Sequence, residues 1–164
     1  MENLILPAVV VFSVVLALLI HVVKSWLERS FLGRAGYTTK KLMTANEVDF
    51  FHRLRKALDP RWTVFPQVSM GALMDTTLKP AHPRFWDARR VFSSKICDFV
   101  VCDAKTLKPQ LIIELDDRMH DFSKDRTRDT LCARAGYRTI RFWSRAKPNP
   151  TELKERLAAA LILN

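Results

Sequence analysis

The first part of the chain is continuously apolar. Residues 4–23 carry no formal charge at neutral pH. Three residues interrupt the apolar run: Pro7, Ser13 and His21. An α-helix of this length, at about 1.5 Å rise per residue, spans a hydrocarbon core of roughly 30 Å. The pattern predicts a transmembrane anchor within residues 1–23, followed by a basic juxtamembrane linker over residues 24–41.

A cleaved signal peptide and a buried helix of a soluble domain are the two alternatives for this segment. A signal peptide has a basic start, a shorter apolar stretch and a small-residue cleavage site, whereas this chain has Glu2 at its start and Lys24-Ser25-Trp26 after the run. The basic residues that follow are Lys24, Arg29, Arg34, Lys40 and Lys41. The positive-inside rule therefore predicts a single pass through the cytoplasmic (inner) membrane, with the C-terminal domain in the cytoplasm.

The remaining residues, 42–164, show helical and strand patterns in turn. A helix is predicted to begin after Thr44, because Thr44-x-x-Glu47 matches a capping box, and to end at Pro60. The predicted strands cover residues 62–68, 96–102, 110–115 and 137–143. The polar stretch over residues 75–94 contains prolines and is predicted to be a loop.

Two more helices are predicted toward the C-terminus. Residues 125–135 lack a helix breaker and are followed by Gly136, which suits a left-handed C-cap. Asn149-Pro150 begins a terminal helix that reaches Leu163. The order of helix, three strands, helix, strand and helix predicts one α/β domain over residues 42–164. A doubly wound dinucleotide fold is excluded, because no GxGxxG or P-loop motif is present.

The composition adds a strong positive charge. The chain has 27 Lys and Arg against 17 Asp and Glu, a formal net charge of +10. Residues 1–23 contain one acid and no base, so the rest of the chain carries +11. This excess favours nucleic acid or the anionic membrane face as partner, although basic residues beside a membrane also set topology. Three cysteines without CxxC spacing indicate neither a disulfide framework nor a zinc site.

Acidic residues lie at the ends of two predicted strands. Asp98 comes directly before an apolar run, and Glu114 and Asp116 come at the end of another. A buried carboxylate must be paired, protonated or bound to a metal. Since side chains alternate along a strand, Glu114 and Asp116 are expected on one face. If the two strands are neighbours, Asp98 and Glu114 could hold Mg²⁺, with the Leu115 carbonyl as a further ligand.

These pieces, taken in order, resemble the PD-(D/E)xK, or restriction-endonuclease-like, nuclease superfamily. More narrowly, the chain looks like a bacterial domain of unknown function related to the very-short-patch-repair-like endonucleases. The matching pieces are Glu47, Phe65-Pro66-Gln67-Val68, Asp98-Phe99-Val100, Ile113-Glu114-Leu115-Asp116-Asp117-x-x-His120, Arg128-Asp129, Ala135-Gly136-Tyr137 and Arg141-Phe142. The resemblance covers about residues 42–145 and implies a mixed sheet flanked by helices.

The resemblance also implies an activity and a set of site residues. The activity would be a Mg²⁺- or Mn²⁺-dependent endonuclease that hydrolyses nucleic-acid phosphodiester bonds, in DNA in preference to RNA. Asp98 and Glu114 would be the metal-binding acids and Glu47 an accessory acid. Gln67 would be a site residue from the first strand, and His120 a candidate general acid or base.

One position departs from the general superfamily pattern, because Asp116 stands where that pattern has lysine. Without the ammonium group, water activation would depend on His120, on a second metal ion bound through Asp116, or on a base such as Lys95 or Lys124. The related subfamily pattern also carries an acid at this position. Loss of activity therefore does not follow from the departure.

Several residues also have simpler structural interpretations. Glu47 could act only as the third residue of its capping box, and Gln67 and Asp98 only as hydrogen-bonding strand residues. Arg128 could form a surface ion pair with Asp125 instead of contacting phosphate.

The aromatic residues Phe142 and Trp143 are expected in the core and not as stacking platforms. For the whole protein, one alternative is a catalytically inactive nuclease fold that binds nucleic acid at the membrane. Another is a membrane scaffold in which the acids are structural.

Overall fold

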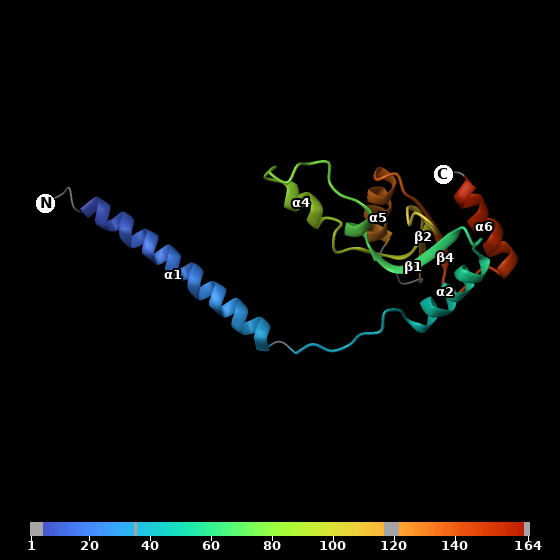
Figure 1. The fold of residues 1–164 in the computed structure, drawn as a ribbon, viewed down its shortest axis with the longest axis horizontal. Helices are drawn as coiled ribbons and strands as arrows, with labels where there is room; N and C mark the ends of the chain where they lie inside the picture. The colour runs from blue at the N-terminus through green and yellow to red at the C-terminus, as the bar shows by residue number, and fades with distance from the viewer. Residues whose placement is uncertain (1–4, 35, 117–121, 163–164) are drawn as a thin grey trace. The chain divides into compact units, whose positions relative to one another are not determined.

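The computed structural model describes residues 5–34, 36–116 and 122–162 (Figure 1). The chain divides into two compact units, Met1–Lys40 and Lys41–Asn164. The first unit contains a single described helix, and the second contains the sheet.

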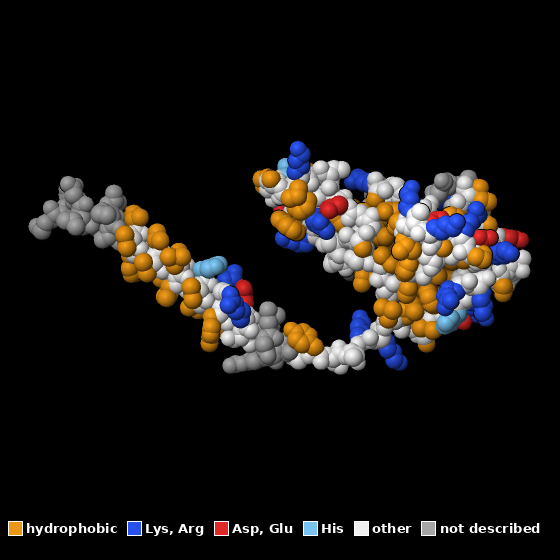
Figure 2. All heavy atoms as spheres, in the orientation of Figure 1, with side chains coloured by type: hydrophobic (Ala, Val, Ile, Leu, Met, Phe, Trp, Pro, Cys, Tyr) orange, Lys and Arg blue, Asp and Glu red, His pale blue; other side chains and the backbone are white. Residues whose placement is uncertain are grey.

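Helix α1 (Ile5–Arg34) forms most of the first unit. Its segment Val9–Ser30 has 22 residues and a mean hydropathy of 2.2, with none of it buried inside the protein. Figure 2 shows apolar side chains along this helix. The helix is therefore long and apolar enough to cross a membrane, as the sequence predicts. It continues past Val23 to Arg34, so the first half of the predicted linker is helical.

The second unit is built on a four-stranded mixed sheet in the order β1-β2-β3-β4. The strands are β1 (Trp62–Ser69), β2 (Ile96–Asp103), β3 (Pro109–Asp116) and β4 (Arg138–Trp143). The pairs β1–β2 and β2–β3 are antiparallel, whereas β3 and β4 are parallel and are connected through a helix. The predicted α/β architecture, with a mixed sheet flanked by helices, is confirmed.

Helices pack on both faces of this sheet (Figure 1). The helices of the second unit are α2 (Ala45–Ala57), α3 (Met70–Leu73), α4 (Phe85–Arg90), α5 (Phe122–Arg134) and α6 (Pro150–Ile162). The prediction of a loop over residues 75–94 is wrong where α4 forms, and the buried side chain of Phe85 anchors that helix. Helix α5 begins earlier than predicted, at Phe122.

The first face of the sheet is covered by α2 and α6 and is called the α2/α6 face. Its buried cluster consists of Phe50, Leu54, Val64, Phe99, Val101, Leu111, Ile113, Leu115, Phe142, Leu153, Leu157, Ala160 and Leu161. Helix α2 begins with the predicted capping box: the Thr44 N–H donates to Glu47 Oε2 at 2.6 Å, and the Glu47 N–H donates to Thr44 Oγ1 at 3.3 Å. The cap fixes where α2 begins, and therefore where Glu47 lies.

The opposite face is covered by α5 and the short helix α3 and is called the α5 face. Its buried cluster is smaller and consists of Met70, Phe92, Cys97, Val100, Cys102, Ile112 and Cys132. Alternation along β3 places Leu111, Ile113 and Leu115 on the α2/α6 face and Ile112 on the α5 face. The acidic positions of β3 therefore fall on the α5 face.

Strand β1 changes face at Gln67. Trp62 and Val64 pack against the cluster of the α2/α6 face, whereas Val68 packs against that of the α5 face. Regular alternation would keep all three on one face. Gln67 has a φ of 55°, in the left-handed region that costs a non-glycine residue about 1–2 kcal/mol. This backbone conformation breaks the alternation of β1 and positions Gln67 locally.

Candidate functional site

The hairpin of β2 and β3 brings two of the predicted site acids opposite each other. Phe99 pairs with Ile113 in the antiparallel register. One position further along the same register, Asp98 lies across from Glu114. Glu114 has the parity of Ile112, which belongs to the α5 face, and the charge of Asp98 acts directly on the Glu114 carboxylate, so the two acids lie close together. The condition for a shared site, that the two acid-bearing strands be neighbours, is therefore met.

The Asp98 carboxylate is oriented by the backbone of the neighbouring strand. Its Oδ2 accepts a hydrogen bond from the Leu115 N–H at 2.9 Å. Burial raises the pKa of Asp98, the Leu115 hydrogen bond opposes that rise, and the charges of Glu47 and Asp116 add to it. Leu115 thus contacts Asp98 through its N–H, and a ligand role for its carbonyl stays a prediction.

Glu114 is the most deeply buried acid of the site. It is only 1% exposed. Burial, with the charge of Asp98 added, raises its pKa to about 9, although Arg128 acts in the opposite direction. Arg128 Nη2 lies 2.9 Å from Glu114 Oε2. Within the described part of the chain, neither carboxylate oxygen of Glu114 has a partner in hydrogen-bonding geometry. A buried acid in this state is expected to bind a proton, water or a cation.

Asp116 is held by an arginine of the neighbouring strand. Arg141 Nη1 lies 2.7 Å from each Asp116 carboxylate oxygen, and Arg141 Nη2 lies 2.7 Å from Asp129 Oδ1 on α5. Burial alone would lower the pKa of Arg141, but its hydrogen bonds to Asp129 and Asp116 raise it overall. Asp116 therefore already has a cationic partner, and a second metal ion bound through Asp116 stays a prediction.

Glu47 and Gln67 complete the group. Gln67 Nε2 donates to Glu47 Oε1 at 3.0 Å, while the other Glu47 oxygen closes the capping box. The pairs Pro66–Phe99 and Val68–Cys97 share one register, so Gln67 lies across from Asp98. Glu47 thus has its simple capping role and in addition binds a predicted site residue.

The structure brings five of the six predicted catalytic residues to one end of the sheet. Four of them are acids, here called the acid cluster: Glu47, Asp98, Glu114 and Asp116. Gln67 is the fifth. The sixth, His120, lies outside the described residues, as do Asp117 and the side chain of Lys124.

The oxygen donors suit a hard cation held by few protein ligands. Among the described residues, no group of three or more His, Cys, Asp or Glu is arranged to hold a metal ion. Mg²⁺ commonly binds one or two carboxylates and keeps several waters. Asp98 and Glu114 fit such a site, because they lie close together and because, among the residues that the structure describes, Glu114 has an ion pair with Arg128 but no well-aligned hydrogen bond. They do not fit a closed cage of protein ligands.

Sequence reasoning did not assign the two arginines to these acids. Arg128 and Arg141 appear in the resemblance, yet nothing local predicts that they contact Glu114 and Asp116 across the α5 face. The side chain of Asp125, the expected partner of Arg128, lies outside the described residues. The core prediction is confirmed for Phe142, which is 1% exposed, and is wrong for Trp143, which is 51% exposed.

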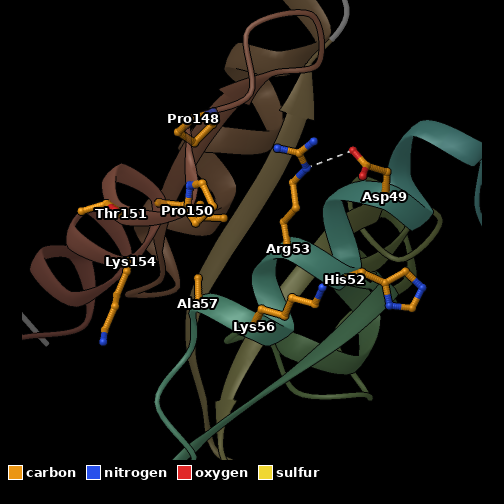
Figure 3. Close-up of a pocket in the computed structure, with 10 residues that line it drawn as sticks. Asp49, His52, Arg53, Lys56, Ala57, Pro148, Pro150, Thr151 and Lys154 are labelled. Atoms are coloured by element: carbon orange, nitrogen blue, oxygen red, sulfur yellow. Dashed lines mark hydrogen bonds and ion pairs between the residues drawn. The ribbon is translucent and has the colours of Figure 1, made fainter.

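A separate cavity of about 650 Å³ lies between α2 and the start of α6 (Figure 3). Its lining residues are Asp49, His52, Arg53, Lys56, Ala57, Pro148, Pro150, Thr151, Leu153 and Lys154. Arg53 Nε lies 3.1 Å from Asp49 Oδ2, and the same carboxylate oxygen lies 2.8 Å from Lys147 Nζ. The charged side chains of the lining are therefore basic apart from one neutralised acid, and the lining includes no member of the acid cluster.

Comparison with known proteins gives a family. Residues 39–161 match the model of a family described as "Protein of unknown function (DUF2726)". The match covers most of the chain, so the chain belongs to this family. No curated protein and no solved structure matches the chain.

Proposed function

Taking membership of this family as the starting point, we propose that the protein is a membrane-anchored, metal-dependent nuclease that hydrolyses phosphodiester bonds in nucleic acid. One observation carries the proposal. Glu114 is a buried carboxylate that forms an ion pair with Arg128 but no well-aligned hydrogen bond within the described chain, and it faces Asp98 at the end of a β-hairpin. Burying two acids together costs stability. A bound cation would offset that cost, because it would neutralise the two carboxylates.

The chemistry would be shared between a bound cation and the surrounding side chains. A Mg²⁺ or Mn²⁺ ion held by Asp98 and Glu114 would polarise the phosphodiester and lower the pKa of an attacking water. The Leu115 N–H orients Asp98. Arg128, 2.9 Å from Glu114, is placed to contact an anionic oxygen beside the same carboxylate. Arg141 neutralises Asp116 and so reduces repulsion of an anionic substrate.

The charge and the first helix support the proposed substrate and location. The chain beyond residue 23 carries an excess of eleven basic residues, which favours a polyanion. Helix α1 is long and apolar enough to anchor the protein. We place the nuclease unit on the cytoplasmic side of the inner membrane, because the basic residues follow the apolar run. DNA is the proposed substrate in preference to RNA.

A second candidate function has its own support. Asp116 stands where the superfamily pattern usually has lysine, and it forms an ion pair with Arg141. Glu114 forms an ion pair with Arg128. In this arrangement the guanidinium groups of the two arginines lie beside the acids in place of metal ions. The alternative is therefore a catalytically inactive nuclease fold that binds nucleic acid at the membrane.

Cleavage by the full chain in detergent micelles separates the two functions. Labelled DNA and RNA are incubated with Mg²⁺ or Mn²⁺, and with a chelator as the blank. The nuclease proposal predicts metal-dependent cleavage that falls by at least about 100-fold in Glu114→Gln and Asp98→Asn. Glu152→Gln, an exposed acid on α6, is the matched control and should cleave as wild type.

Two other results would decide against the nuclease. Equal cleavage by wild type and Glu114→Gln would mean that a contaminant or another site cleaves the nucleic acid. Salt-sensitive binding of nucleic acid that survives both acid substitutions, without turnover by wild type, selects the binding module.

A further inference from the structure

A second cavity lies beside the acid cluster, where β3 and β4 end. Its volume is about 400 Å³, and its lining residues are Asp116, Trp143, Ser144, Arg145 and Ala146. One member of the acid cluster, Asp116, thus forms part of its wall. A molecule that occupies this cavity would be a direct neighbour of anything bound at the acids.

The register of the sheet places Trp143 on the face of the acids. Trp143 pairs with Asp116 in the parallel ladder, as Arg141 pairs with Glu114. Arg141 contacts Asp116 on the α5 face, and Phe142 packs into the cluster of the α2/α6 face. Alternation therefore turns Trp143 toward the α5 face, the same face as Asp116.

The indole of Trp143 is exposed at a position where burial would be expected. Trp143 is 51% exposed, whereas its neighbour Phe142 is 1% exposed. Burying an aromatic ring stabilises a protein, because it removes apolar surface from water. The exposed ring beside Asp116 offers a flat apolar surface to a ligand.

The wall around this indole is held by backbone hydrogen bonds. The Ser144 N–H donates to the Asp116 carbonyl at 2.9 Å, and the Ala146 N–H donates to the Trp143 carbonyl at 3.1 Å. The turn after β4 is thus tied to the end of β3. Arg145, an exposed cation in this turn, adds positive charge to the rim.

We propose that this cavity is a nucleobase subsite, in which an unpaired base stacks on Trp143 while the adjoining phosphate lies at the acid cluster. An aromatic platform with a neighbouring cation is a typical binding surface for single-stranded nucleic acid. The inference rests on the proposed function and deepens it. It assigns the substrate to nucleic acid with an unpaired base at the site of cleavage, and it makes Trp143 a specificity-determining residue.

Binding without cleavage provides the first test. The full chain in detergent micelles is titrated, in chelator, with a fluorescent single-stranded oligonucleotide. Because stacking of one base on an aromatic ring contributes strongly to affinity, Trp143→Ala should weaken binding roughly 5- to 100-fold. Trp143→Phe should stay within about threefold of wild type, since a ring is retained. Trp86→Ala is the matched control, an exposed tryptophan on α4 at 66% exposure, and should bind as wild type.

The salt dependence of binding distinguishes a stacking role of Trp143 from a purely electrostatic one. Trp143→Ala should lower affinity at every salt concentration and leave the slope of log affinity against log salt unchanged, since no phosphate contact is removed. A reduced slope would assign the loss to charge at the rim and would overturn the stacking role.

A second test removes the base from the oligonucleotide and leaves the protein unchanged, which avoids any folding defect of a variant. Wild-type protein is titrated with an oligonucleotide that carries abasic positions, and the loss of affinity should match that of Trp143→Ala. Equal binding of normal and abasic strands, or equal loss in Trp143→Ala and Trp86→Ala, overturns the subsite.

These results also separate the two proposals. Metal-dependent cleavage without any effect of Trp143 removes only the subsite. A Trp143-dependent preference for single strands without cleavage removes only the nuclease. A wild-type chain that binds no nucleic acid, either in chelator or with Mg²⁺ present, removes both.

Discussion

The two faces of the same sheet differ in what they contain. The α2/α6 face is a continuous apolar cluster from Phe50 on α2 to Leu157 on α6. The α5 face has fewer apolar residues, and two carboxylates of β3, Glu114 and Asp116, occupy positions that apolar side chains could fill. Because burying charge costs stability whereas burying apolar surface contributes it, the first face stabilises the fold and the second carries groups that the fold alone does not require.

The difference appears within the single strand β3. Its residues Ile113 and Leu115 face apolar neighbours, and Glu114 between them faces Asp98 and Arg128. The same backbone therefore holds both environments in fixed register. A rigid, apolar face behind the acids is what keeps a binding site precise.

The largest expected effect comes from breaking the apolar face. Phe50 is fully buried, with its ring centroid 5.8 Å from that of Phe99 and 5.2 Å from that of Phe142. Phe50→Ala should lower the free energy of unfolding by about 3–5 kcal/mol, because it leaves a cavity in a packed core. Thermal or denaturant unfolding measures this loss. Phe65→Ala, at a ring that is 40% exposed, is the control, and an equal loss there would contradict the comparison.

The pH dependence of stability tests whether the buried carboxylate of Glu114 on the α5 face destabilises the fold. The pKa of Glu114 is about 9 in the folded protein, against 4.5 for the ordinary side chain. The folded state therefore keeps a proton that the unfolded chain loses, and wild-type stability falls as the pH rises between these two values. Glu114→Gln removes this loss. Relative to wild type, the variant should gain up to about 4 kcal/mol between about pH 5 and about pH 8, since one pKa unit corresponds to about 1.4 kcal/mol.

Denaturant unfolding in the presence of a chelator, repeated across this pH range, measures the difference. Glu152→Gln, a substitution of an acid that is 51% exposed, is measured as the control under the same conditions. A difference between Glu114→Gln and wild type that stays constant with pH would mean that Arg128 keeps Glu114 ionised in the folded state.

A smaller effect is expected from the arginine that holds Asp116. Arg141→Met retains an apolar stem but leaves Asp116 and Asp129 without their shared guanidinium. The expected loss of stability is about 1–3 kcal/mol, less than for a fully buried pair because the Arg141 side chain is 27% exposed. Arg53→Met breaks an exposed pair with Asp49 and should cost under about 1 kcal/mol. Equal losses in the two variants would show that the α5 face does not hold its charges more tightly than the surface does.

Local signals in the sequence predicted much of the fold. The capping box at Thr44 marks the start of α2, and alternating apolar runs joined by a short turn predict the β2–β3 hairpin. The same alternation predicts that Glu114 and Asp116 share a face. These features depend on residues close together along the chain, so they can be read without knowing the tertiary structure.

The rest depends on contacts between distant segments. Arg128 reaches Glu114 only because α5 packs across β3, and Trp143 is exposed only because no described element buries the end of β4. The left-handed backbone at Gln67 has no sequence signal, because such conformations favour glycine. The polar residues and prolines around α4 make its short helical pattern hard to recognise in the sequence. Periodicity alone contains none of this information.

The central claim is that Asp98 and Glu114 together bind a divalent cation. Calorimetric titration of the full chain with Mn²⁺ tests it most directly, with wild type, Glu114→Gln and the exposed-acid control Glu152→Gln measured side by side. If the two acids hold the cation, wild type and Glu152→Gln bind about one ion per chain, and Glu114→Gln shows no measurable binding. Identical isotherms for wild type and Glu114→Gln, or no binding by wild type, would contradict it.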